Sequence, residues 1–323
     1  MVSVCVLSYN HENYIRQCLD GIMMQEVSFP IEVIIHDDAS TDKSQQIIQE
    51  YVQKYPDIVK PIFQKENQYS KRKSIVGHFL FPKCTGKYVA LCEGDDYWTD
   101  PLKLQKQVDF MESHPEYSFC CHRFVIYEQN KNIYRQEYAH AYYQDGKNLE
   151  ITENLFLNVW VTMTLTSLYR RDAAEKAIST CLEKYHDTKD VYLFYELLQL
   201  AKGISLNQNM GVYRWHDKGV AIGQDSVSRY KNGVDTYAKI YEQHQNDKLL
   251  LPKIRYNYNR YLRFITVSKE GNASLKTSFV YCETILQRIQ MITTYLIPPI
   301  LFVISNKIFK YYWRKKCSIS NPY

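Results

Sequence analysis

Residues 88–98 read Tyr-Val-Ala-Leu-Cys-Glu-Gly-Asp-Asp-Tyr-Trp, an apolar run that ends abruptly in acidic residues. A short, continuous apolar run is typical of a strand buried on both faces of a parallel sheet. Similar runs occur upstream at residues 2–8, 31–35 and 59–63, separated by apolar residues at helical spacing. The first segment of about 110 residues therefore predicts an α/β sheet in which strands and helices alternate and the strands are largely parallel.

The remainder of the chain has a different pattern. It predicts a longer strand over 117–127, a polar loop over 128–146, a strand over 163–169, helices over 171–183 and 191–202, and helical structure from 226 onward. We expect a catalytic domain over 1–225, with a donor-binding half over about 1–115 and an acceptor half over about 116–225. Residues 226–323 then form a basic, mainly helical C-terminal region with an amphipathic tail.

Polar residues follow three of the predicted strands. They are Ser8-Tyr9-Asn10, Asp37-Asp38 and Asp95-Asp96. In parallel α/β sheets, ligands bind beyond the carboxyl ends of the strands. Adjacent carboxylates at a buried strand end repel each other and lose hydration, which favours a bound divalent cation that bridges to phosphate oxygens. The alternative is that an individual acid such as Asp37 or Asp42 only forms a turn or caps a helix.

Three ordered motifs carry a resemblance to a known family. They are V-S-V-C-V-L-S-Y-N, H-D-D-A-S-T-D and E-G-D-D-Y-W-x-D-P-x-K-L. Together they resemble glycosyltransferase family 2, the inverting enzymes with the GT-A fold, over roughly residues 1–220. The resemblance implies a Rossmann-like, nucleotide-sugar-binding sheet with a helical C-terminal extension.

The resemblance also implies roles for individual residues. It places Ser8, Tyr9 and Asn10 in the donor-binding stretch, with Tyr9 near the nucleotide base. Asp38 would accept a hydrogen bond from uracil, and Asp95 would hold the ribose or the sugar. Asp96 would ligate Mn²⁺ or Mg²⁺ that bridges the diphosphate and stabilises the charge on the leaving group.

The catalytic base is assigned by a weaker motif. Asp190, at the start of a predicted helix, resembles the place where this family keeps the carboxylate that takes the proton of the acceptor hydroxyl. The family often has an aromatic residue directly after this Asp, whereas here the residue is Val191. Asp187 is therefore the rival candidate. A third reading is an acid that only complements the helix dipole.

The stretch Gly211-Val-Tyr-Arg-Trp-His216 is similar to a V-Y-R-x-H segment near the end of these catalytic domains. It implies that Arg214 contacts the donor diphosphate and that His216 is a further candidate metal ligand. The alternative for His216 is an ordinary, hydrogen-bonded histidine at a strand end.

These motifs favour transfer of one sugar from a nucleotide-sugar, expected to be a UDP-sugar, to a glycan or lipid-linked glycan acceptor. A processive synthase usually shows Q-x-x-R-W, but Gly211 stands three residues before Arg214. A non-catalytic sugar-nucleotide binder and a nucleotidyltransferase are the alternatives. The residues after Ser8 lack the Gly-rich basic loop of nucleotidyltransferases, and no Gly-rich phosphate motif of dehydrogenases or ATPases occurs.

Charge and cysteine usage bear on partners and compartment. From Lys248 to Tyr323 there are 13 Lys/Arg and 2 Asp/Glu, a balance of +11, so the preceding residues carry −6 of the total of +5. The tail (residues 287–316) joins an apolar run over 295–304 to five basic residues, which favours an anionic membrane surface over nucleic acid. Nine scattered cysteines indicate a reducing cytosol.

We therefore expect a cytoplasmic protein, peripheral at the inner face of the cell membrane, with no nucleic-acid partner. The apolar N-terminus reads as a first strand because no basic segment precedes it, which argues against a signal peptide. The sequence assigns neither the donor sugar, the acceptor, the linkage nor the oligomeric state.

Overall fold

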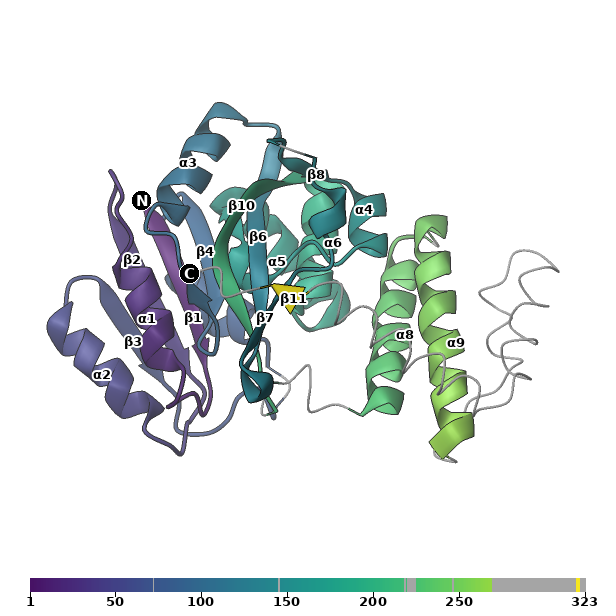
Figure 1. The fold of residues 1–323 in the computed structure, drawn as a ribbon, viewed down its shortest axis with the longest axis horizontal. Coiled ribbons are helices and arrows are strands. Elements are labelled where there is room, and N and C mark those ends of the chain that lie inside the picture. Colours follow the sequence, from purple (N-terminus) through teal and green to yellow (C-terminus); the bar gives the residue numbers. More distant parts are fainter. Residues whose placement is uncertain are drawn as a thin grey trace. The chain divides into compact units, whose positions relative to one another are not determined.

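The computed structural model describes residues 1–71, 73–144, 146–217, 219, 225–245, 247–268 and 318–319 (Figure 1). The chain divides into two compact units, one running from Met1 to Arg214 and the other beginning at Trp215. Among the described helices, none combines the length and the hydropathy needed to cross a bilayer. The predicted amphipathic tail lies outside the described residues.

The first unit is built on one mixed sheet. The strands of the chain are β1 (Val2–Ser8), β2 (Ile31–Asp37), β3 (Val59–Phe63), β4 (Tyr88–Glu93), β5 (Tyr97–Trp98), β6 (Tyr117–Glu128), β7 (Ile133–Gln136), β8 (Leu149–Ile151), β9 (Leu168–Arg170), β10 (Lys202–Trp215) and β11 (Ser318–Ile319). From β7 the order is β7-β6-β9-β4-β1-β2-β3. Pairs among β4, β1, β2 and β3 are parallel, whereas β9 joins β4 and β6 in antiparallel fashion.

The register brings the three predicted strand ends together. Leu7 pairs with Glu93, and Ser8 pairs with Asp37. Two hydrogen bonds continue the ladder past the strands, from Asp38 N–H to the Ser8 carbonyl at 2.9 Å and from Gly94 N–H to the Leu7 carbonyl at 2.8 Å. The polar residues after β1, β2 and β4 therefore meet at one edge of the sheet, as the sequence predicts.

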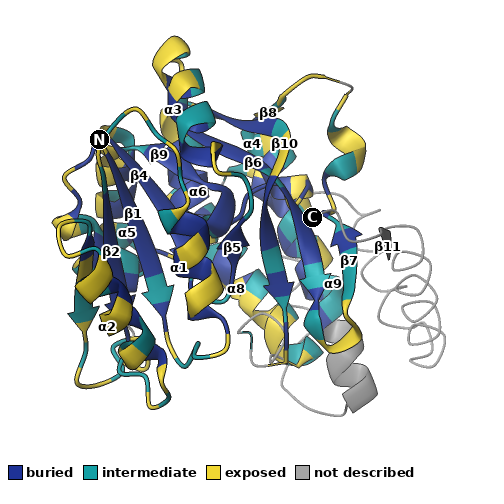
Figure 2. Ribbon diagram, turned by 60° about the vertical axis from the view of Figure 1, so that its left-hand side comes forward, coloured by how far each residue is buried: buried dark blue, intermediate teal, exposed yellow. Residues whose placement is uncertain are grey.

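Helices cover the sheet and bury the faces that their apolar spacing predicts. In the first unit they are α1 (Ile15–Met23), α2 (Ser44–Lys54), α3 (Lys103–Ser113), α4 (Glu153–Asn158), α5 (Arg171–Tyr185) and α6 (Asp190–Leu200), with short 3₁₀ or π segments at η1 (Val76–Leu80), η2 (Phe81–Lys83), η3 (Gln129–Lys131), η4 (His140–Tyr142) and η5 (Thr164–Thr166). The described helices of the second unit are α8 (Ser226–Gln243), α9 (Leu251–Ser268) and the short η6 (Lys248–Leu250). In α1, for example, Ile15, Leu19 and Ile22 are fully buried. Figure 2 shows α1 and α2 on the near face of the sheet, with exposed outer surfaces over buried strands.

Three local predictions differ from the structure. The segment 128–146, predicted as a loop, contains β7, which forms an antiparallel hairpin with β6. The rings of Tyr127 and Tyr134 stack across this hairpin with centroids 4.7 Å apart. The periodicity of a single strand does not predict such a cross-strand contact.

The segment 163–169, predicted as one strand, is a strand only in β9. Its first part forms η5, where the Thr166 and Ser167 amides donate to the carbonyls of Met163 and Thr164. The Leu165 carbonyl is left free of the ladder and accepts a 2.8 Å hydrogen bond from the Trp98 indole. The predicted helix 191–202 also ends early, at Leu200, and Lys202 begins β10.

The second unit contains the helices α8 and α9, which pack against each other. Gly233 permits their close approach, because a Cβ atom there would lie 2.4 Å from Oδ1 of Asn257. Val234, Ile240 and Ile254 are buried within this helical pair. The boundary at 225 remains a prediction. The described C-terminal residues are mainly helical, in α8, η6 and α9, with the two-residue strand β11 as the exception.

Candidate functional site

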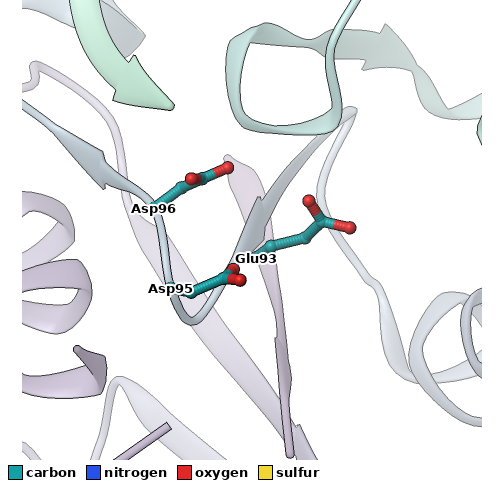
Figure 3. A group of neighbouring side chains, drawn as sticks. All are labelled: Glu93, Asp95 and Asp96. Atoms are coloured by element: carbon teal, nitrogen blue, oxygen red, sulfur yellow. The ribbon is translucent and has the colours of Figure 1, made fainter. Parts of the chain in front are cut away.

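An acidic cluster lies at the end of β4 and in the turn that follows it (Figure 3). One ligand oxygen from each of Glu93, Asp95 and Asp96 lies within 4.8 Å of the others. The turn is closed by the Asp96 N–H, which donates to the Glu93 carbonyl at 3.0 Å. A Cβ at Gly94 would lie 2.8 Å from Nδ1 of His11, so only glycine fits between the acids.

Burial and mutual repulsion disfavour the ionised forms of these carboxyl groups. Burial, followed by the charges of Asp95 and Glu93, raises the pKa of Asp96 well above its usual value. Burial also raises the pKa of Glu93 to about 8, with the charges of Asp95 and Asp190 adding to the effect. Oδ1 of Asp96 accepts a 2.8 Å bond from the Arg214 N–H, whereas its buried Oδ2 has no hydrogen-bond partner among the described residues. These oxygens fit a hard divalent cation, which would offset the repulsion.

Arg214 connects the acidic turn to neighbouring parts of the chain through hydrogen bonds and ring contacts. Its Nε donates to the Asp95 carbonyl at 2.8 Å, and its terminal nitrogens donate to the side chains of Gln17 and Gln129 at 2.6 Å and 3.2 Å. The guanidinium also lies over the rings of Tyr14 and Tyr97, with centroid distances of 5.1 Å and 5.0 Å. The structure therefore gives Arg214 a role in positioning the turn, and its predicted contact with a diphosphate remains a prediction.

Trp98 and Lys103 anchor the turn on its other side. The buried Lys103 ammonium lies 3.7 Å from the centroid of the Trp98 indole and, within the described chain, forms no hydrogen bond. Burial lowers the pKa of Lys103 to about 7. The Lys of the E-G-D-D-Y-W-x-D-P-x-K-L motif thus fixes the aromatic residue that follows the acids.

The acids at the end of β2 are arranged differently, because protein donors surround both of them. Oδ1 of Asp38 accepts from the Gln68 N–H at 2.7 Å, and Oδ2 accepts from the Tyr69 N–H at 3.0 Å. Asp37 accepts from the hydroxyls of Ser8 and Ser40, the Ser40 N–H and the amide of Gln45. Asp38 therefore fixes the loop around residues 67–69, and Asp37 fixes the turn into α2.

The segment after β1 is fixed to the same turn. Asn10 has a positive φ of 55°, and its side-chain oxygen accepts from the Thr41 N–H at 2.8 Å. Tyr9 is left 46% exposed at the edge of the sheet. Nε2 of His11 lies 3.8 Å from Oδ2 of Asp95, which joins this segment to the acidic cluster. The structure thus brings together Ser8, Tyr9, Asn10, Asp38, Asp95 and Asp96, as predicted.

The two candidates for the base have different surroundings. Asp190 begins α6, and its carboxylate accepts a 2.8 Å bond from the Val191 N–H. Its charge raises the pKa of Glu93, so it lies within electrostatic range of the acidic cluster. The charge of Asp187 acts instead on Asp190 and on the buried thiol of Cys181. The surroundings favour Asp190, and neither role is tested by the geometry alone.

Two residues of this site, Glu93 and Tyr213, are not among the site residues predicted from the sequence. Glu93 was part of the quoted E-G-D-D motif, and its place at the end of β4 could have identified it. Tyr213 stands in β10 next to Arg214, and the charges of Asp96, Glu93, Asp95 and Asp190 all contribute, after burial, to raising the pKa of its phenol. Its only sequence signal was its place in the V-Y-R-x-H stretch.

His216 belongs to the second unit, as does Asp217. The ring of His216 is buried, and it has an interaction within the protein. Its predicted role as a metal ligand remains a prediction.

Comparison with known proteins gives a family match. The model of "Glycosyl transferase family 2" matches residues 3–178. A protein of unknown function from Mycobacterium tuberculosis is 48% identical over 130 residues, which are 39% of this chain and 36% of the relative, so the match spans about a third of that relative's length.

Two solved structures are similar in fold. TarS 1–349 of S. aureus, crystallised with UDP-GlcNAc, superposes with a TM-score of 0.57 at 19% identity over 91% of this chain and 79% of TarS. A mannosyltransferase of Pyrobaculum calidifontis, solved with GDP-Man and Mn²⁺, gives a TM-score of 0.54 at 15% identity over 93% of this chain and 86% of the other.

Proposed function

The chain belongs to glycosyltransferase family 2 and has the GT-A fold, and on that premise we propose that it transfers a single sugar, with inversion, from a UDP-sugar to a carbohydrate or lipid-linked acceptor. The observation that carries the proposal is the acidic cluster, with Oδ2 of Asp96 buried and, in the described part of the chain, unpartnered. Asp190 lies within electrostatic range of the same cluster.

Glu93, Asp95 and Asp96 would hold the metal, Mn²⁺ or Mg²⁺. Three carboxylates provide hard oxygen ligands, and a cation would favour their ionised forms against the burial that now opposes ionisation. When bound, such an ion would stabilise the negative charge that develops on the departing diphosphate. The Mn²⁺ in the mannosyltransferase of the same fold supports this choice.

The nucleotide would bind along the ends of β1 and β2. Tyr9 offers an exposed ring for stacking on the base, and the loop around residues 67–69, fixed by Asp38, forms the neighbouring wall. Ser8 and Asn10 keep the two strand ends together. The UDP-GlcNAc in TarS supports uridine as the base, whereas the GDP-Man in the mannosyltransferase keeps guanosine as the competing choice.

Asp190 would act as the base. The acceptor hydroxyl attacks the anomeric carbon, its proton passes to the Asp190 carboxylate, and the bond from that carbon to the diphosphate oxygen breaks. Attack on the face opposite the diphosphate inverts the anomeric configuration. Asp190 is exposed at the start of α6, so an acceptor hydroxyl can reach its carboxylate.

A screen of nucleotide-sugar hydrolysis tests the proposal. Purified protein is incubated with UDP-, GDP- and dTDP-sugars, with Mn²⁺, Mg²⁺ or EDTA, and the released nucleoside diphosphate is quantified. We expect release from at least one UDP-sugar that depends on the metal. Absence of release from every donor, together with absence of UDP binding, would contradict the assignment, whereas UDP binding without release would favour the non-catalytic sugar-nucleotide binder.

We also propose, from the sequence alone, that the basic tail attaches the protein to an anionic membrane surface. Flotation with anionic and neutral liposomes, for the full chain and for a truncation after Glu283, tests this. We expect only the full chain to float with anionic vesicles, and to be released by salt. Failure of both proteins to float with anionic vesicles at low salt would contradict membrane attachment, and equal flotation of both would contradict attachment through the tail.

A further inference from the structure

A group of aromatic rings lies next to the acidic cluster, and part of it faces solvent. Trp160, between α4 and η5, is 39% exposed, and Tyr138 is 40% exposed. The Trp160 indole packs edge-to-face against Tyr213 at 5.8 Å and Phe124 at 6.0 Å, and it lies 5.3 Å from the Tyr138 ring. We call these four residues the Trp160 platform.

The platform is connected to the acids in two ways. Tyr213 is one of its members, and the charges of Glu93, Asp96 and Asp190 all act on its phenol. Thr164, four residues after Trp160, lies close enough to the Glu93 carboxyl for its side chain to lower the pKa of that group. Four residues span at most about 14 Å, so Trp160 and the acidic cluster stand at the two ends of one short segment.

The position of the platform in the sheet separates it from the donor side. The predicted nucleotide residues follow β1 and β2, on one side of β4. Phe124 and Tyr213 belong to β6 and β10, which continue the sheet on the other side of β4. A group bound on the platform would therefore reach the acids from the side opposite the nucleotide, which is where an acceptor must stand for inversion.

The chemistry of the platform favours an uncharged ring. A large indole held by two edge-to-face contacts presents a rigid apolar surface at little entropic cost. The apolar C–H face of a pyranose matches such a surface, while its hydroxyls remain free for polar partners. We propose that the Trp160 platform is the acceptor subsite and that it binds a neutral pyranose ring. This inference rests on the proposed function, since an acceptor is needed only for transfer.

Binding of simple sugars tests the inference without turnover. Saturation-transfer NMR is recorded with methyl glycosides of glucose, galactose and N-acetylglucosamine, in the presence of UDP and Mn²⁺, and with an aliphatic alcohol as the competing apolar probe. We expect at least one methyl glycoside to receive saturation from the wild type. Trp160→Ala should weaken its affinity about tenfold, and Trp160→Phe should retain part of it. Tyr142→Ala, a neighbouring aromatic residue that is 52% exposed, serves as the matched control and should bind like the wild type.

Two outcomes would overturn the inference. One is equal saturation transfer to the glycosides in the wild type and in Trp160→Ala, or none in either. The other is binding of the aliphatic alcohol alone, which would indicate a lipid or protein surface. UDP affinity should be the same in all variants, because the platform is not on the donor side.

Transfer kinetics separate the failure of this inference from the failure of the proposed function. With an active donor, Trp160→Ala should raise the KM for the glycoside about tenfold, whereas the Tyr142→Ala control should leave that KM unchanged. An unchanged acceptor KM with active donor hydrolysis would overturn the subsite and leave the glycosyltransferase assignment intact. The protein could also bind the glycoside through Trp160 and yet hydrolyse no donor. That result would overturn the proposed transferase activity and leave Trp160 as a sugar-binding residue.

Discussion

The ends of β2 and β4 both carry adjacent acids, and the two pairs are arranged in opposite ways. Asp37 and Asp38 accept hydrogen bonds from backbone amides and hydroxyls that fix the turns around them. Asp96 is as deeply buried, yet its Oδ2 has no partner in the described chain, and burial together with neighbouring carboxylates raises its pKa. The first pair organises the protein, whereas the second is left with bonding capacity for a cation. Similar sequence signals therefore correspond to different hydrogen-bond surroundings.

The largest effect that separates the two pairs is on catalysis. We expect Asp96→Asn to reduce donor turnover by about 10³-fold or more, because it removes a charged ligand of the proposed metal. The same change should raise the free energy of unfolding of the metal-free protein, since an amide is not repelled by Glu93 and Asp95. Turnover and chemical denaturation of both proteins, in EDTA and in Mn²⁺, measure the two effects. Loss of both stability and turnover would indicate a structural acid instead.

The next effect concerns the base. We expect Asp190→Asn to reduce transfer by about 10²–10⁴-fold while UDP and metal affinity remain unchanged, because the proton acceptor is used only in the transition state. Asp187→Asn is the matched control, three residues earlier, and should retain near-normal transfer. Steady-state transfer and calorimetric UDP binding test both variants. The opposite pattern would assign the base to Asp187.

The acids at the end of β2, which accept hydrogen bonds, should contribute to the stability of the fold. Asp37→Ala leaves four buried or partly buried donors without their acceptor, and we expect it to lower the free energy of unfolding by about 1–3 kcal/mol. Urea unfolding in EDTA measures the change. Stability equal to that of the wild type would mean that the hydrogen bonds of Asp37 are not needed for the fold, and the contrast with Asp96 would disappear.

The last effect is a dependence of stability on pH, which is spread over several pH units. The pKa of Glu93 is raised from 4.5 to about 8, so its protonated form is favoured by folding. The stability of the metal-free protein should therefore fall as the pH rises from 4.5 to about 8. Glu32 is a useful contrast. Burial opposes its ionisation, but hydrogen bonds from Lys60, Ser3 and Thr85 lower its pKa to about 2. The contribution of Glu32 to the free energy of unfolding is therefore lost only as the pH falls below 4.5.

Thermal unfolding at several pH values, for the wild type and Glu93→Gln, measures this dependence. The variant should have a flatter profile than the wild type between pH 4.5 and 8. Excess Mn²⁺ should also flatten the wild-type profile, because the metal favours the ionised carboxylates. Identical profiles for the two proteins in EDTA would show that Glu93 does not carry this effect.

The alternating strands and helices of the first half could be predicted from sequence, because residues such as Ile34 and Leu91 sit in apolar runs buried on both faces. The meeting of Ser8, Asp38 and Asp96 followed from the rule that ligands bind at the carboxyl ends of parallel strands. The β6–β7 hairpin did not, because its stabilising contact between Tyr127 and Tyr134 is made across strands.

The difference between the two acid pairs was also out of reach of the sequence. Whether an Asp finds donors depends on distant backbone amides, such as those of Gln68 and Tyr69 around Asp38, which lie thirty or more residues away. Tyr213 and Trp160 meet through tertiary packing between β10 and the segment before η5. Neither has a local pattern that reveals its neighbourhood.

Calorimetric titration of UDP tests most directly whether the acids after β4 hold a cation that bridges to a nucleotide diphosphate. The titration is run with the wild type and with Asp96→Asn, each in Mn²⁺ and in EDTA. We predict that Mn²⁺ tightens UDP binding to the wild type by about tenfold or more, and that Asp96→Asn abolishes this difference. Equal UDP affinity of the wild type in Mn²⁺ and in EDTA would contradict the account.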